Sequence, residues 1–211
     1  MFRAWGKYLL DKEIEESKFI DGILTGKLDL EYFNRFEIQD GRYLTEGSDV
    51  LKNTGNILKE KYEDFEKISI VQAKKYDDQR DILLKKYAQS SFNCVILHPA
   101  TARYVEFLRN DPRIKADPRR LLFAVLACSH SWRYISRKTL PHVNDENVYK
   151  EKWLVPNFRE ENYESELETF LNKKYEEKMF TEGEIKILEE LYLDAMKHEV
   201  NFIRYGGDPV N

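Results

Sequence analysis

Cysteine, glycine and proline are all scarce in this chain of 211 residues. It contains two cysteines, Cys94 and Cys128, nine glycines and six prolines. Two cysteines cannot build the disulfide framework of a small secreted domain, which indicates a reducing compartment. The glycines and prolines cluster where helical patterns stop, and the alternation of apolar and polar residues that marks strands is rare. The sequence therefore predicts an all-α protein.

The chain also lacks a long apolar run and an excess of basic charge. No stretch approaches the roughly 20 apolar residues of a membrane-spanning helix. The amphipathic N-terminus lacks the uninterrupted apolar core of a signal peptide. The net charge is -4, with acids and bases mixed along the chain, which gives no basic surface for nucleic acid. We expect a soluble cytoplasmic protein that binds neither nucleic acid nor membrane.

The length and the absence of a linker predict a single domain over residues 1–211. Helical periodicity predicts eight or nine helices. Asp29 as an N-cap, Asp117 before a proline, and a capping box of Thr181 and Glu184 mark three of the expected starts. The expected ranges are about 2–20, 30–47, 48–62, 64–88, 98–110, 118–138, 146–154, 159–178 and 182–204.

One of these helices carries a carboxylate on its aromatic face. In the helix over about 30–47, Asp40 lies at helical spacing with Phe33, Phe36 and Tyr43. A buried carboxylate is unfavourable unless it is paired or hydrogen-bonded. Asp40 is therefore either part of a structural ion pair or part of a catalytic site.

Three further helices place a polar group on an inward face: Tyr104, His130 and Glu199. Each has a structural explanation, namely a core tyrosine, a hydrogen-bonded core histidine, and a glutamate paired with Arg42 or Arg103. Together with the carboxylate of the second helix, they indicate a shared polar cavity inside a helical bundle. Aromatic walls and two carboxylates suit a flat, nitrogen-rich ligand, because rings stack and carboxylates accept amino hydrogens.

Motifs for cofactors and metals are missing from the chain. We find no glycine-rich phosphate loop, no G-x-S-x-G elbow and no H-E-x-x-H helix. Asp194 and His198 are four residues apart and could chelate a metal, but many surface helices carry such a pair by chance. We therefore expect neither a metal nor a cofactor.

Four segments, in this order, resemble the TenA family of thiaminase II-like proteins. They are FNRFEIQDGRYL at 33–44, PATARYVEFL at 99–108, LFAVLACSHSWRYI at 122–135 and HEVNF at 198–202. The first resembles the family's F-x-x-Y-x-x-Q-D-x-x-Y-L helix, with Phe36 in place of the tyrosine. The others resemble its proline-threonine helix, its P-C-x-W-x-Y helix and its E-x-x-F helix. The likeness spans nearly the whole chain.

This resemblance implies the haem-oxygenase-like helical bundle and the hydrolysis of aminopyrimidines derived from thiamin. Asp40 would bind the pyrimidine amino group, Tyr43 and Tyr104 would line the ring pocket, and Glu199 would be the general acid and base. The other expected substrate-binding residues are Phe36, Trp132, Tyr134 and Asn157. The expected partners are a pyrimidine-like small molecule and further copies of the chain, as a dimer or tetramer.

Two positions depart from the family's pattern. Aligned on Trp132 and the tyrosine after it, the nucleophilic cysteine of the family falls on His130. Cys128 lies two residues upstream, roughly 200° around an ideal helix, and is otherwise a common type of core residue. Where the family has a pocket tyrosine after the tryptophan of YKEKWL, this chain has Asn157. The reactive group is therefore either His130 as a replacement or Cys128 reached through a distorted helix.

Three functions are consistent with these residues. The retained acids and tyrosines favour a TenA-like hydrolase of C–N bonds in an aminopyrimidine or related heterocycle, in thiamin salvage or a diverged pathway. The changed cysteine and Asn157 favour a non-catalytic ligand-binding or regulatory member of the family. A PqqC-like cofactorless or metal-dependent oxidase using His130 and His198 is the third and least favoured.

Overall fold

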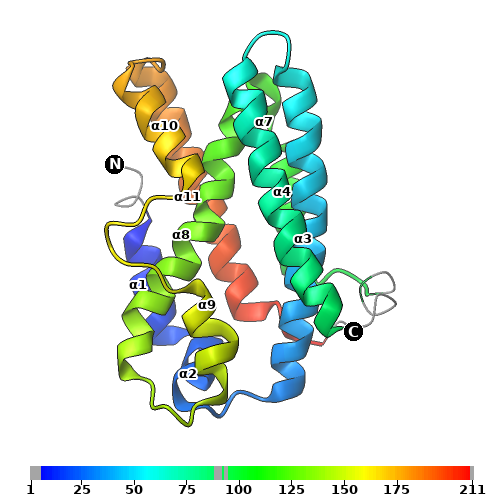
Figure 1. Ribbon diagram of the computed structural model, residues 1–211, viewed down its shortest axis with the longest axis vertical. Coiled ribbons are helices and arrows are strands. Elements are labelled where there is room, and N and C mark those ends of the chain that lie inside the picture. The colour runs from blue at the N-terminus through cyan, green and yellow to red at the C-terminus, as the bar shows by residue number, and fades with distance from the viewer. Residues whose placement is uncertain (1–5, 88–91, 93–94, 210–211) are drawn as a thin grey trace.

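The computed structural model describes residues 6–87, 92 and 95–209, and all of the secondary structure in these residues is helical (Figure 1). This confirms the prediction of an all-α protein. Eight described helices have eight or more residues: α1 (Lys7–Glu16), α2 (Lys18–Thr25), α3 (Leu30–Leu58), α4 (Glu63–Lys86), α6 (Pro99–Asn110), α8 (Leu121–Thr139), α10 (Glu166–Glu176) and α11 (Glu182–Tyr205). Shorter segments are α7 (Pro112–Ala116), the 3₁₀ turns η2 (Pro118–Arg120) and η3 (Leu140–His142), the π-helical turn η4 (Lys150–Leu154) and α9 (Val155–Asn157). Cys94 lies outside the described residues.

The helices α8 and α11 form the centre of the bundle. They pack on each other, and every residue from Leu121 to Cys128 is buried. The long helices α3 and α4 pair along one side, α6 packs on both α3 and α11, and α1 covers α8 and α11 from the other side (Figure 1). The core therefore lies where α3, α6, α8 and α11 meet. Among the described helices, none is long and apolar enough to span a bilayer.

The expected break between two helices near residue 47 does not occur, because α3 is continuous over 29 residues. Gly47 and Ser48 are small for a packing reason instead. A Cβ atom on Gly47 would lie 2.8 Å from the Tyr76 ring, and Ser48 donates a hydrogen bond to the Ala73 carbonyl at 3.2 Å. These small residues let α3 and α4 approach closely.

Other helix boundaries differ from the prediction where a side chain caps the backbone. The single helix expected over about 2–20 is divided, because Ser17 has extended backbone and accepts a hydrogen bond from the Ile20 amide as the N-cap of α2. Residues 1–5 of that prediction lie outside the described residues. The polar helix expected from about 159 begins only at Glu166, after the N-cap Ser165.

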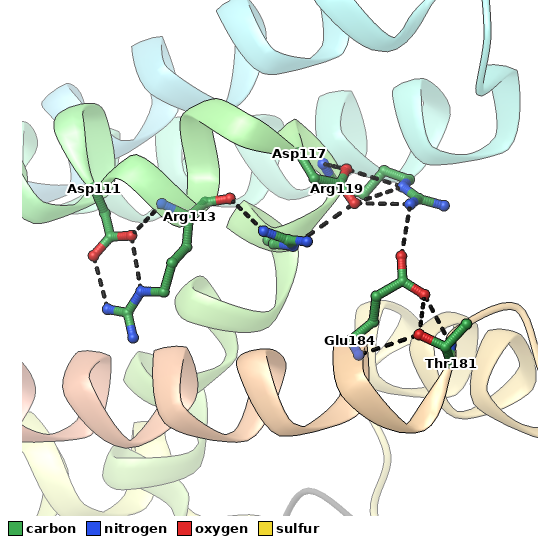
Figure 2. Close-up of polar contacts among 7 residues, drawn as sticks. Asp111, Arg113, Asp117, Arg119, Thr181 and Glu184 are labelled. Atoms are coloured by element: carbon green, nitrogen blue, oxygen red, sulfur yellow. Dashed lines mark hydrogen bonds and ion pairs between the residues drawn. The ribbon is translucent and has the colours of Figure 1, made fainter.

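An Asp-Pro-Arg sequence occurs twice between α6 and α8, as Asp111–Arg113 and Asp117–Arg119. In each, the aspartate accepts hydrogen bonds from the arginine's backbone amide, at 2.8 and 3.1 Å, and from its guanidinium (Figure 2). Asp111 therefore ends α6 and caps α7. Arg119 also lies 3.8 Å from Glu184 at the start of α11, so the repeat connects this turn region to the last helix.

The capping box at the start of α11 is confirmed. The Glu184 amide donates to the Thr181 hydroxyl at 3.3 Å, and the Thr181 amide donates to the Glu184 carboxylate at 2.8 Å (Figure 2). Two amides that would otherwise lack partners are satisfied in this way.

We predict that Thr181→Ala lowers the free energy of unfolding by about 1 kcal/mol, because the first turn of α11 loses its cap. Denaturant unfolding monitored by circular dichroism measures this. Thr169→Ala is the matched control, since Thr169 is exposed within α10 and alanine favours a helix. An equal loss in both variants would contradict the capping role.

Candidate active site

Five helices direct polar side chains toward one region of the core. We call this set the interior cluster: Asp40 and Tyr43 from α3, Tyr76 from α4, Tyr104 from α6, Cys128 from α8 and Glu199 from α11. The charge of Asp40 acts on both Glu199 and Cys128, and the charge of Glu199 acts on all three tyrosines. The three tyrosines and Glu199 are at most 3% exposed.

Stacked rings form the walls around these polar groups. The rings of Tyr43 and Tyr104 stack at 4.7 Å, and Tyr76 lies 6.0 Å from Tyr43. On the other side, Phe36 lies 4.9 Å from Phe202 and 5.7 Å from the Trp132 ring. An interior built from aromatic faces offers stacking surfaces to a flat ligand.

Several buried polar atoms of the cluster lack a hydrogen-bond partner among the described residues. They are both carboxylate oxygens of Glu199 and the hydroxyls of Tyr43, Tyr76 and Tyr104. Each such group is unfavourable by about 1–3 kcal/mol, and native proteins contain few of them. Their concentration at one point indicates a site that binds polar atoms from outside the chain.

The two carboxylates of the cluster have raised pKa values. Burial raises the pKa of Glu199 to about 8, the charge of Asp40 adds to the rise, and the nearby Tyr104 hydroxyl partly opposes it. Burial, followed by the charge of Glu37, raises the pKa of Asp40 to about 7. Asp40 keeps some accessible surface, although its surroundings desolvate the charge.

No structural ion pair accounts for Glu199. Among the described residues, no basic side chain lies within 4 Å of its carboxylate, and Arg42, one of the expected partners, pairs with Glu46 at 3.2 Å instead. Both carboxylates therefore remain able to hold or release a proton near neutral pH, which is the property a general acid or base requires.

Cys128, and not His130, is the α8 residue in the cluster. Burial, then the charges of Glu199 and Asp40, raise the pKa of the Cys128 thiol, and the nearby polar groups of Trp132 and Tyr76 only partly oppose this. The helix is continuous here, so no distortion is needed. Cys128 and Trp132 are four residues apart and share a face.

His130, which the sequence analysis expected in the pocket, lies outside the interior cluster. Its Nδ1 atom lies 2.8 Å from the Tyr192 hydroxyl, and its Nε2 atom lies 3.4 Å from the buried Glu168. Tyr134, also expected to bind substrate, hydrogen-bonds to Asp11. Both residues line a separate pocket of about 560 Å³ formed by α1, α8, α11 and the segment 160–163.

The physical reason is the register of the motif on α8. Residues two apart on a helix point about 200° apart, so Cys128 and His130 cannot face the same space. Aligned on Cys128, the P-C-x-W-x-Y pattern places His130 at its tryptophan and Trp132 at its tyrosine. In the structure, Cys128 therefore takes the inward position that the alignment on Trp132 gave to His130.

Two other sequence candidates have local structural contacts instead. Asn157 donates a hydrogen bond to the Trp153 carbonyl at 2.8 Å, within its own turn. The Trp153 ring, which the sequence did not single out, contacts the Trp132 ring edge-on at 5.1 Å. A tryptophan from this segment therefore supports the wall of the cluster.

The pair on α11 that could have chelated a metal is divided between different contacts. Asp194 pairs with Arg113 at 2.8 Å and with Lys197 at 2.9 Å, while the His198 ring stacks on the Tyr104 ring at 5.6 Å. Within the described residues, no group of three or more His, Cys, Asp and Glu side chains could hold a metal ion.

Tyr76 is the cluster residue that sequence reasoning missed. The sequence analysis predicted this helix but singled out none of its residues, although its inward face is regular. The buried residues of this face are Phe65, Ile68, Ser69, Gln72, Ala73 and Tyr76. This spacing is the signal that could have placed Tyr76 toward the core.

No protein-family model and no curated protein matches the sequence. Among solved structures, a TenA homologue protein from P. horikoshii OT3 matches with a TM-score of 0.75. The match covers 97% of this chain and 95% of that chain, at 17% sequence identity. This chain has the fold of a TenA homologue. The expected haem-oxygenase-like helical bundle is therefore confirmed, and at this identity the likeness to the TenA homologue concerns the fold alone.

We predict that Glu199→Gln becomes more stable relative to the unsubstituted protein as the pH rises from about 5 to about 8. In this window the folded protein holds a proton on Glu199, whose pKa is about 8, while the unfolded chain has lost it. The stability of the unsubstituted protein therefore falls with pH, by on the order of 3 kcal/mol. Denaturant unfolding across this pH range measures the difference.

Asp194→Asn is the matched control for this experiment. The pKa of Asp194 is lowered by hydrogen bonds from Lys197 and Arg113 despite partial burial. Its contribution is present above its ordinary pKa and is lost as the pH falls, so this variant gains no stability at pH 8. A pH-independent difference for Glu199→Gln would contradict the raised pKa.

Proposed function

We propose that the protein is a TenA-like hydrolase that cleaves a C–N bond of an aminopyrimidine or related nitrogen heterocycle. The observation that supports this most is the interior cluster itself. Two carboxylates with raised pKa values and a thiol lie among stacked tyrosines, and the Glu199 oxygens and the three tyrosine hydroxyls lack hydrogen-bond partners among the described residues. The likeness of the fold to that of a TenA homologue also supports the proposal. Thiamin salvage or a diverged pathway remains the proposed setting.

The cluster gives each residue a separate task. The ring of the ligand would stack against Tyr43 and Tyr104, and its amino group would donate a hydrogen bond to Asp40. Two carboxylates and no basic group favour a ligand that carries N–H donors or positive charge. Binding of such a ligand would supply the hydrogen-bond partners that the buried oxygens of Glu199 lack.

Cys128 would act as the nucleophile, with Glu199 as the general base that accepts its proton. The thiol gives its proton to the Glu199 carboxylate as its sulfur forms a bond to the ligand carbon. For an aminopyrimidine whose leaving group is an amine, the C–N bond breaks and the leaving nitrogen takes that proton from Glu199. In the second step a water molecule gives a proton to the Glu199 carboxylate, and the resulting hydroxide attacks the ligand carbon. The bond between this carbon and the Cys128 sulfur breaks, and the sulfur takes the proton from Glu199 to become a thiol again. The products are an alcohol and an amine.

A non-catalytic ligand-binding protein is the second candidate. Burial keeps the Cys128 thiol protonated, and no basic side chain is among the groups that lower its pKa. A site that binds the heterocycle without attacking it would fit this observation. The oxidase alternative is less favoured, since His130 contacts Tyr192 and His198 contacts Tyr104 and Phe107. Assembly as a dimer or tetramer in the cytoplasm stays a prediction from the family resemblance.

We predict that purified protein releases product from thiamin or an aminopyrimidine, and that Glu199→Gln and Cys128→Ser each lower kcat/KM by at least about 100-fold. Product formation measured by liquid chromatography tests this. His130→Asn is the matched control, because His130 lies on the other face of α8, and it should retain activity within about threefold.

The two candidate functions give different outcomes in the same assay. If the probe raises the melting temperature but no product forms, the protein binds without catalysis. If the probe neither binds nor reacts, both candidates are wrong. Full activity in Cys128→Ser would show that the thiol is not the nucleophile, and the nucleophile would then be a water molecule activated by a carboxylate.

A further inference from the structure

Tyr76 enters the interior cluster from α4, a helix that carries none of the segments resembling TenA. Its side chain is 3% exposed, and its hydroxyl oxygen is buried without a hydrogen-bond partner among the described residues. The side chain of a core tyrosine normally finds a partner for its hydroxyl. The position of this hydroxyl therefore calls for an explanation beyond packing.

The surroundings of the Tyr76 hydroxyl show which way it faces. Besides burial, the charges of Cys128, Glu199 and Asp40, from three other helices, raise the pKa of this hydroxyl, and the nearby Tyr43 hydroxyl partly opposes the rise. Its ring lies 6.0 Å from the Tyr43 ring at an angle of 47°. The hydroxyl thus points toward the acids and the thiol, and the ring extends the aromatic wall.

The contact between α3 and α4 is built to admit this ring. Gly47 faces it, and a Cβ atom there would lie 2.8 Å from Cε2 and 3.0 Å from Cδ2 of Tyr76. Along the helices from this ring toward the α3–α4 connection, Ser48 donates to the Ala73 carbonyl at 3.2 Å and Ser69 donates to the Leu51 carbonyl of α3 at 2.7 Å. Small residues and these hydrogen bonds hold α4 close enough for Tyr76 to reach the cluster.

We propose that Tyr76 is a ligand-binding residue whose hydroxyl hydrogen-bonds a polar edge atom of the bound heterocycle, and that the absence of a side chain at Gly47 gives its ring access to the site. This inference rests on the proposed ligand class but not on turnover. Amino hydrogens of the ligand go to the carboxylates, so its ring nitrogens require donors, and tyrosine hydroxyls are donors. A site that satisfies such an atom discriminates against ligands that lack it.

The proposal predicts opposite effects of Tyr76→Phe on stability and on binding. Removing a hydroxyl without a partner leaves the melting temperature equal or higher, because no internal hydrogen bond is lost. The same change weakens the affinity for thiamin or an aminopyrimidine by about tenfold. Thermal unfolding and isothermal titration calorimetry measure the two quantities on the same preparations.

Tyr192→Phe is the matched control. Tyr192 is also buried, at 1% exposure, but its hydroxyl bonds His130 on the other face of α8. This variant should melt at a lower temperature and bind the probe with unchanged affinity. A lower melting temperature for Tyr76→Phe with unchanged affinity would overturn the proposal, since the hydroxyl would then be structural.

Gly47→Ala provides a second test that does not alter Tyr76. The added methyl group displaces the Tyr76 ring, so probe affinity falls, also by about tenfold. Gly183→Ala is the control, because a Cβ atom there meets nothing within 4 Å and affinity should not change. Unchanged affinity in Gly47→Ala, with Tyr76→Phe also unaffected, would contradict the role of both residues.

The same titrations separate this inference from the proposed function. Binding by the unsubstituted protein that persists in Tyr76→Phe disproves only the role of Tyr76. Binding that weakens in Tyr76→Phe but yields no product supports Tyr76 and points to the non-catalytic alternative. If the unsubstituted protein binds neither thiamin nor an aminopyrimidine, the proposed ligand class is wrong and so is the role of Tyr76.

Discussion

The desolvation of two neighbouring carboxylates without a basic partner is the constraint on which the rest of this structure depends. Asp40 and Glu199 are held close enough for the charge of one to oppose ionisation of the other. In a medium of low polarity such a pair favours the protonated form, and its two proton affinities belong to the pair as a whole. The bundle must supply enough packing elsewhere to tolerate this arrangement.

That packing comes from the central helix. The N-terminal half of α8 is buried on all sides, so its faces can be assigned to different neighbours. One face presents Cys128 and Trp132 to the interior cluster, while another presents His130 to Tyr192 and Glu168. Because a helix turns by about 100° per residue, a shift of two positions exchanges one environment for the other.

The contact between α3 and α4 shows how local sequence and function are connected. Gly47 reduces the helix propensity of α3, yet α3 continues through it because tertiary packing outweighs propensity. The glycine is explained by the Tyr76 ring beside it. Gly47 is thus unfavourable for α3 itself but allows Tyr76 of the neighbouring α4 to reach the interior cluster.

The sequence alone determined the all-α class, the capping box at Thr181 and the inward direction of Glu199, because each depends on helical periodicity or on residues within a few positions of each other. Tertiary structure decided which residue of α8 meets the acids, since alignment to a motif cannot fix helix rotation. It also decided that Tyr76 reaches them, because the approach of α4 depends on Gly47 in another helix. Contacts between distant segments, and the orphaned polar atoms they create, exist only once the helices are packed.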